Sequence, residues 1–132
     1  MTPTIWDPED IFPPISGTRV SLASDPFGVH LGRKDYIWEF RNEIPTIMQR
    51  AHDMGINWIR VHFDWTKIET SQGDYNWEIT DDFVSRAENL SISLLVDIEG
   101  YPDMALYNES EKATKYNDFV RAFVQRYKDR VD

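Results

Sequence analysis

The sequence predicts an α/β protein built from three consecutive strand–helix units. Three short apolar runs recur along residues 27–132, and each is followed by a segment whose apolar residues have helical spacing. The runs begin near residues 28, 56 and 92, and this spacing of about 30 to 35 residues is that of a βα unit. Right-handed crossovers make the strands of such units parallel. We therefore expect a partial TIM (β/α)8 barrel, because three strands are too few to close one.

Residues 1–26 are expected to form an irregular arm before this domain. Five of the seven prolines lie there, and proline fixes φ and removes a backbone donor. The arm therefore holds at most a short strand at residues 18–23. The first residues show neither a basic nor an apolar leader, so the chain as written has no signal peptide. A cytoplasmic protein and a secreted mature protein both remain possible.

The first two units can be placed from their apolar runs and their stop signals. The first strand is expected at residues 27–31, and its helix covers residues 44–54. Gly55 can take the left-handed conformation that ends this helix. The second strand is expected at residues 56–63, and the second helix opens at Thr80.

The third unit has the strongest apolar pattern. Its strand, residues 92–98, is almost wholly apolar, as expected of a strand covered on both faces. Its helix is expected from about Ser110 to Arg130. The buried stripe of this helix is predicted to contain Tyr116, Phe119, Val120, Phe123, Val124 and Tyr127.

Composition narrows the classes of partner. The chain has 14 Lys and Arg against 23 Asp and Glu, a net charge of −9. This balance argues against nucleic acids and anionic membranes, which bind concentrated positive charge. A carbohydrate or an apolar protein face meets no such repulsion. There is no cysteine, so thiolate metal sites and disulfides are excluded, and no cofactor is expected.

Functional side chains in parallel βα folds collect at the carboxyl ends of the strands. That rule selects residues 28–32, residues 60–65 with the loop to Trp77, and residues 97–102. The candidate substrate-binding residues at these places are His30, Arg60, His62, Trp65 and Tyr101.

Strand alternation places Arg60, His62 and Asp64 on one face of the second strand. An arginine in so apolar a strand needs a carboxylate partner. Such a pair could be purely structural, or Arg60 could hold a catalytic carboxylate ionised and oriented. His30, His62 and Asp64 have donor types that suit several metals. Their spacing is not diagnostic, however, and we predict no metal site.

Asp64 and Glu99 are the candidate catalytic carboxylates. They would end neighbouring strands, and two carboxyl groups about 5–5.5 Å apart are what retaining glycoside hydrolysis requires. The alternative is that both are ordinary solvated or hydrogen-bonded carboxylates.

Residues 51–77 resemble the second βα unit of the (β/α)8 glycoside hydrolases, nearest to β-xylosidase-like family 39 and β-galactosidase-like family 42. The shared elements are, in order, Gly55, Trp58-Ile59-Arg60, Trp65-Thr66-Lys67-Ile68-Glu69 and Gly73-Asp74-Tyr75-Asn76-Trp77. Residues 27–29 resemble the first strand of those enzymes, and residues 123–127 resemble the third helix. The likeness covers about residues 26–132.

The resemblance implies roles for several residues. Arg60 would contact the nucleophile, and Trp65 would stack on a sugar or pack under its loop, which Glu69 and Trp77 would brace. The acid/base and nucleophile glutamates of these enzymes follow strands 4 and 7, and neither has a counterpart here. Asn42-Glu43 and Asn108-Glu109 stand instead at expected helix starts.

The expected function is therefore the amino-terminal portion of a glycoside hydrolase, which holds part of a sugar-binding site and is inactive alone. Two alternatives remain open. One is a non-catalytic half-barrel that acts by self-association or complementation, because three strands leave two open edges. The other is a small hydrolase that uses Asp64 and Glu99.

Overall fold

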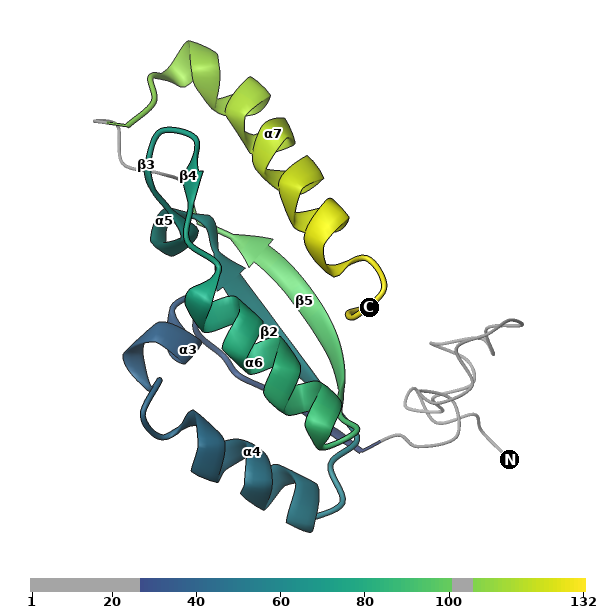
Figure 1. The fold of residues 1–132 in the computed structure, drawn as a ribbon. Helices are drawn as coiled ribbons and strands as arrows, with labels where there is room; N and C mark the ends of the chain where they lie inside the picture. Colours follow the sequence, from purple (N-terminus) through teal and green to yellow (C-terminus); the bar gives the residue numbers. More distant parts are fainter. Residues whose placement is uncertain (1–26, 101–105) are drawn as a thin grey trace, which may run out of the picture.

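The computed structural model describes residues 27–100 and 106–132 (Figure 1). Three parallel strands form its main sheet: β1 (Gly28–His30), β2 (Trp58–Asp64) and β5 (Ser93–Glu99), in the order β1-β2-β5. The predicted α/β class and partial barrel are thus confirmed. The expected arm, its short strand and Tyr101 lie outside the described residues.

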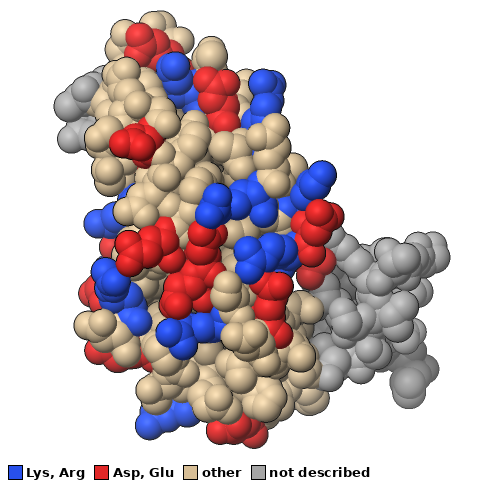
Figure 2. Space-filling model, viewed as in Figure 1, with Lys and Arg blue, Asp and Glu red and all other residues tan. Residues whose placement is uncertain are grey.

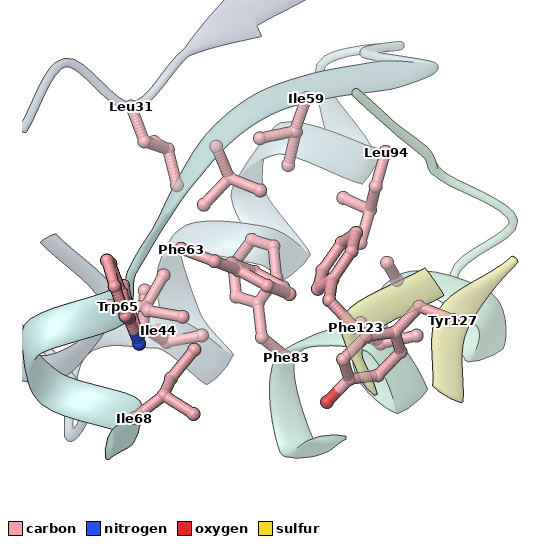
Figure 3. Close-up of a cluster of buried hydrophobic side chains, with 14 of the residues drawn as sticks. Leu31, Ile44, Ile59, Phe63, Trp65, Ile68, Phe83, Leu94, Phe123 and Tyr127 are labelled. Atoms are coloured by element: carbon pink, nitrogen blue, oxygen red, sulfur yellow. The ribbon is translucent and has the colours of Figure 1, made fainter. Parts of the chain in front are cut away.

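One face of the sheet is covered by the long helices α4 (Ile44–Asp53), α6 (Glu78–Asn89) and α7 (Glu109–Tyr127) (Figure 1). The apolar core lies between this face and the helices (Figure 3). Phe63 of β2 meets the rings of Phe123 and Tyr127 edge-on, with centroids 5.8 Å away in both cases. Burial of such rings is the main stabilising contribution to a fold of this size.

The opposite face of the sheet, called here the open face, carries the polar residues of β2 and β5. Ile59, Val61 and Phe63 are fully buried on the helix side, whereas Arg60 points to the open face and is exposed. Leu95 is 39% exposed, although the sequence predicted a third strand covered on both faces. That prediction was wrong because the described helices cover one face only.

Four short elements were not expected from the sequence: α3 (Tyr36–Glu39), α5 (Trp65–Ile68) and the antiparallel strands β3 (Glu69–Ser71) and β4 (Asp74–Tyr75). They are too short to produce a detectable period. In addition, α6 begins at Glu78 rather than Thr80, because the Asn76 side chain accepts a hydrogen bond from the Glu78 N–H at 3.0 Å.

Two predicted helix signals are confirmed. Gly55 has φ +84° directly after α4 and its C-cap residue. The Asn108 side chain caps α7 by accepting a hydrogen bond from the Glu111 N–H at 3.1 Å. Asn42 has no such role, since α4 has Glu43 as its N-cap without a side-chain hydrogen bond.

The helix-covered side carries acidic and basic side chains interspersed with one another (Figure 2). Ion pairs join them within α6, as in Asp82–Arg86, and between α6 and α7, as in Asp81–Arg126. Within the described residues, no helix combines the length and apolar character needed to cross a bilayer.

Candidate functional site

The open face gathers charged and imidazole side chains near the carboxyl ends of its strands. In the strand register His30 is aligned with Arg60, and His62 is aligned with Asp97. Paired residues of parallel strands point to the same face. The resulting group, called here the open-face cluster, consists of His30, Arg60, His62, Asp97 and Glu99. All of these residues except Asp97 are candidate site residues predicted from the sequence.

Arg60 is bound to Asp97 in this cluster. Its Nε donates to Asp97 Oδ2 at 2.6 Å, and its side chain is 45% exposed. A purely structural arginine would be buried and held by two parallel hydrogen bonds. The observed half-exposed guanidinium differs from that arrangement. It can present its terminal nitrogens to a ligand.

The two histidines of the cluster contact each other. His30 Nε2 and His62 Nε2 are 2.8 Å apart, and His62 is buried. On the other side of the His62 ring, Nδ1 lies 3.3 Å from Glu99 Oε1. The described residues include no cluster of three or more side chains with the arrangement of a metal site.

Asp64 has a structural role, which corresponds to the alternative of a hydrogen-bonded carboxylate. It is 1% exposed, and its Oδ1 accepts a hydrogen bond from the Thr66 N–H at 2.9 Å, which caps α5. Burial raises its pKa, and the hydrogen bond from Thr66 partly opposes this rise. Glu99, aligned with it on β5, is 47% exposed and remains accessible.

Trp65 lies in the core rather than at the site surface (Figure 3). It is fully buried, stacks against Phe119 and donates its indole N–H to Glu69 Oε1 at 2.7 Å. No ring face is therefore available to a sugar. This geometry supports the packing alternative for Trp65.

The buried Glu69 holds together several residues of the segment from Trp65 to Trp77. Besides the Trp65 indole, its carboxylate accepts hydrogen bonds from the Gly73 N–H at 2.8 Å and from the Tyr107 hydroxyl. Burial and the Glu69 carboxylate raise the pKa of Tyr107 to about 12. Tyr107 could not be predicted from the sequence, because a contact between residues 38 positions apart leaves no local pattern.

A hollow of about 900 Å³ opens beside the cluster at the carboxyl end of β5. Glu99 and Gly100 line one side, and Lys112 and Tyr116 of α7 line the other. The sequence placed Tyr116 in the buried stripe of this helix, but it is 37% exposed. Val124, from the same predicted stripe, is 46% exposed. The stripe is thus narrower than predicted, with Phe119, Phe123 and Tyr127 as its buried residues.

Three parallel βα units define part of a TIM barrel, and comparison with known proteins agrees with this fold. The sequence model of the cellulase family, glycosyl hydrolase family 5, matches residues 18–131. The chain therefore belongs to this family. The resemblance to barrel glycoside hydrolases is confirmed, and the family identified is family 5. The chain matches no curated protein.

Solved glycoside hydrolases have the same fold at low identity. A family 39 enzyme from Bacteroides cellulosilyticus WH2 has a TM-score of 0.60 and 21% identity, over 80% of this chain and 22% of that chain. Endoglucanase Cel5A from Pseudomonas stutzeri has a TM-score of 0.60 and 18% identity, over 79% of this chain and 38% of that chain. A Cel5A structure in complex with cellobiose has a TM-score of 0.55 and 19% identity, over 65% of this chain and 28% of that chain. The chain thus spans well under half the length of these enzymes.

Proposed function

We propose that this chain forms the amino-terminal wall of a glycoside-hydrolase barrel and contributes part of a carbohydrate-binding site. The observation that carries the proposal is the open-face cluster, in which residues of three neighbouring strands meet near their carboxyl ends. Active sites of TIM barrels lie at that end of the strands. Membership of glycosyl hydrolase family 5 supports a carbohydrate as the class of ligand.

The cluster offers both kinds of hydrogen-bonding group that sugar hydroxyls need. Arg60 is half-exposed and donates, and the exposed carboxylate of Glu99 accepts. Arg60, the permanent cation of the cluster, already has Asp97 as a carboxylate neighbour, so a neutral sugar fits this balance better than an anionic one. His30 is exposed at the edge of the same group.

Cleavage of the glycosidic bond is not expected from these residues alone. By resemblance, the two catalytic glutamates follow strands 4 and 7 of the barrel, and Asp64 is occupied as a helix cap. The test is turnover of nitrophenyl glycosides by the homogeneous chain, with the double variant Asp64→Asn/Glu99→Gln as the control. Turnover that the double variant abolishes would instead support the small-hydrolase alternative.

Binding is tested by titrating the labelled chain with cellobiose and longer β-glucan oligosaccharides, followed by nuclear magnetic resonance. Arg60→Met should weaken binding roughly two- to tenfold, which is the effect of losing one net hydrogen bond. Because the Arg60–Asp97 pair is half-exposed, the variant should lose less than about 2 kcal/mol of stability.

Arg41→Met is the matched control for this variant. Arg41 is 58% exposed, and its ion pair with Glu78 lies on the helix side of the molecule. Equal effects of the two variants on binding, or a large stability loss in Arg60→Met alone, would contradict the assignment of Arg60 to the sugar site.

The half-barrel alternative has one observation in its favour. Apolar side chains are exposed at both ends of the strand order: Phe27 and Val29 at β1 are 66% and 37% exposed, and Leu95 on β5 is 39% exposed. Such surface favours association with a second copy or with a complementing part of a barrel.

A further inference from the structure

The contact between His30 and His62 depends on the number of protons that the two rings carry. Their Nε2 atoms are 2.8 Å apart, and the ring centroids are 4.9 Å apart. A hydrogen bond between two imidazole nitrogens needs one N–H and one bare nitrogen. If both Nε2 atoms were protonated, two hydrogens would face each other across this distance. The contact therefore exists only while one Nε2 is bare.

The carboxylates around His62 favour a proton on the Nδ1 atom of its ring, in addition to the proton between the two Nε2 atoms. Its side chain is 7% exposed, and within the described residues Nδ1 is buried without a hydrogen-bond partner. The atom lies 3.3 Å from Glu99 Oε1 and 3.7 Å from Asp97 Oδ2. A proton on Nδ1 faces both carboxylates, whereas a bare Nδ1 would set its lone pair against theirs.

The other charges around the two rings can accommodate additional protons. From β2, Arg60 and Asp64 flank His62 on the same face, and Asp97 and Glu99 face it from β5. Lys34 follows β1 and acts electrostatically on Asp64. When all of these groups are ionised, they carry two positive and three negative charges. A positively charged ring therefore has more carboxylates than cations around it.

We propose that the pair formed by His30 and His62 makes carbohydrate binding at this site dependent on pH. While only one of the two Nε2 atoms carries a proton, the two atoms are hydrogen-bonded to each other, and neither is available to a ligand. Full protonation of both rings separates them, and the Nε2–H of the exposed His30 becomes available to sugar hydroxyls. This inference rests on the proposed function. Affinity for a neutral oligosaccharide should therefore rise roughly two- to tenfold on acidification, the effect of about one net hydrogen bond.

The proton sharing is tested first, without a ligand, on the full chain. Long-range ¹H–¹⁵N spectra recorded across a pH titration follow each imidazole ring separately. The chain has three histidines, and His52 on α4 is 49% exposed, which makes it an internal reference. We expect the signals of His30 and His62 to change together in two steps, while His52 changes in one. In His30→Asn the His62 signals should change in a single step, and in the matched control His52→Asn they should keep two.

A backbone amide spectrum like that of the unchanged chain shows that each variant is folded, and His30→Gln provides a second replacement. Independent single-step titrations of His30 and His62 in the unchanged chain would overturn the proposal.

Oligosaccharide titrations at two pH values, one on each side of the second step, separate this inference from the proposed function. Stronger binding at the lower pH in the unchanged chain and in His52→Asn, but not in His30→Asn, is the supporting result. Binding with the same pH dependence in all three proteins would overturn the inference and leave the proposed function standing. No binding by the unchanged chain at either pH would overturn the proposed function itself.

Discussion

Asp64 shows how a residue that sequence chemistry marks as catalytic can be accounted for by local structure. Its carboxylate is buried at the end of β2 and caps α5. Burial raises its pKa, so ionisation of Asp64 opposes folding. For a carboxyl group whose pKa is raised on folding, stability falls as the pH rises through the folded-state pKa. The cap and the charge therefore have opposite effects on stability at neutral pH.

Two substitutions at Asp64 separate these effects. Asparagine caps helices as well as aspartate does, and it carries no charge, so Asp64→Asn should keep or slightly increase stability at pH 7. Asp64→Ala should lose about 1 kcal/mol with the cap. Urea denaturation at pH 7 measures both values. Equal losses in the two variants would mean that the ionised carboxylate itself is needed.

For single residues, the sequence predicts which face of a strand a side chain lies on better than it predicts how deeply the side chain is buried. The period of two correctly places Arg60, His62 and Asp64 on one side of β2, and parallel register then brings Asp97 to His62. The burial of Trp65 could not be inferred, because it depends on rings from α7 more than 50 residues away. A tryptophan in a loop motif has the same sequence pattern whether it stacks on a sugar or packs in a core.

At the scale of elements, β5 is followed directly by Gly100, and the neighbouring side chains leave room for no larger residue there. Gly100 has φ +92°, and a Cβ built on it would lie 2.1 Å from Asp64 Oδ1 and 3.0 Å from Thr66 Oγ1. A side chain here would both strain the backbone and displace the cap of α5. The end of β5 and the start of α5 are therefore fitted to each other.

Gly100→Ala should lose roughly 1–3 kcal/mol of stability from the left-handed backbone alone. Gly32→Ala is the matched control, since a Cβ there meets no atom within 4 Å, and it should change stability by less than about 1 kcal/mol. Thermal or urea unfolding compares the two. A tolerated Gly100→Ala would show that the cap can move aside.

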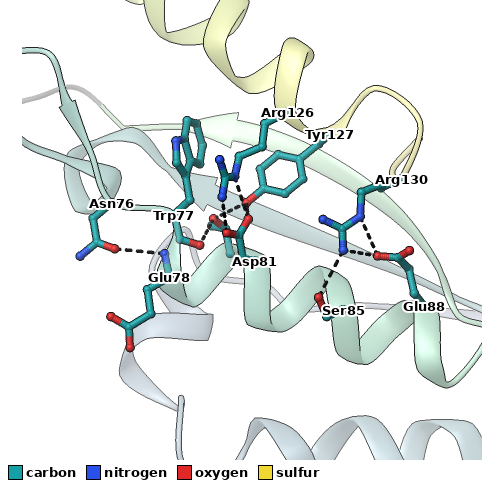
Figure 4. A network of polar contacts seen from close by, with 10 residues as sticks. Asn76, Trp77, Glu78, Asp81, Ser85, Glu88, Arg126, Tyr127 and Arg130 are labelled. Carbon is teal, nitrogen blue, oxygen red and sulfur yellow. Dashed lines mark hydrogen bonds and ion pairs between the residues drawn. The ribbon is translucent and has the colours of Figure 1, made fainter.

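Helices α6 and α7 are joined by a polar network around Asp81 (Figure 4). Arg126 donates from Nε to Asp81 Oδ1 at 2.8 Å, and the Tyr127 hydroxyl donates to the same oxygen at 2.6 Å. The bond from Arg126 is the main cause of a lowered Asp81 pKa. Because the pKa of Asp81 is lowered on folding, the stabilisation is present at pH values above the ordinary pKa of an aspartate. It is lost as the pH falls through the folded-state pKa.

Asp81→Asn should therefore destabilise the protein near neutral pH and weaken the dependence of its stability on pH below about 4. Asp82→Asn is the control, because Asp82 pairs with Arg86 within α6 and is 58% exposed. Urea titrations at several pH values between 3 and 7 give the comparison. An unchanged acid dependence in Asp81→Asn would assign that dependence to other carboxylates.

At the level of elements, the long ones were predictable and the short ones were not. The stop at Gly55 and the cap at Asn108 have local signals that operate within one turn of a helix. The hairpin of β3 and β4 has a local signal only at its turn, where Gly73 has φ +75°. Its short strands have none, and the buried Glu69 holds the turn.

Within residues 27–100 and 106–132, the main sheet has one covered and one open face, and we predict that the chain does not remain a compact monomer. Leu95 lies on the open face, so Leu95→Lys should reduce association, whereas Val124→Lys on the outer side of α7 should not. Light scattering gives the mass, and binding of a hydrophobic dye reports exposed apolar surface. A single 15.6 kDa species without dye binding would contradict this prediction.

The strand order also bears on how the chain reaches its fold. Each strand of the main sheet pairs with the one before it in the sequence, through register partners such as Gly28 with Trp58 and Trp58 with Ser93. Contacts between consecutive units cost less loop-closure entropy than contacts across a whole barrel. During synthesis, each new βα unit can therefore dock on the preceding one as it leaves the ribosome, without first releasing a contact already made.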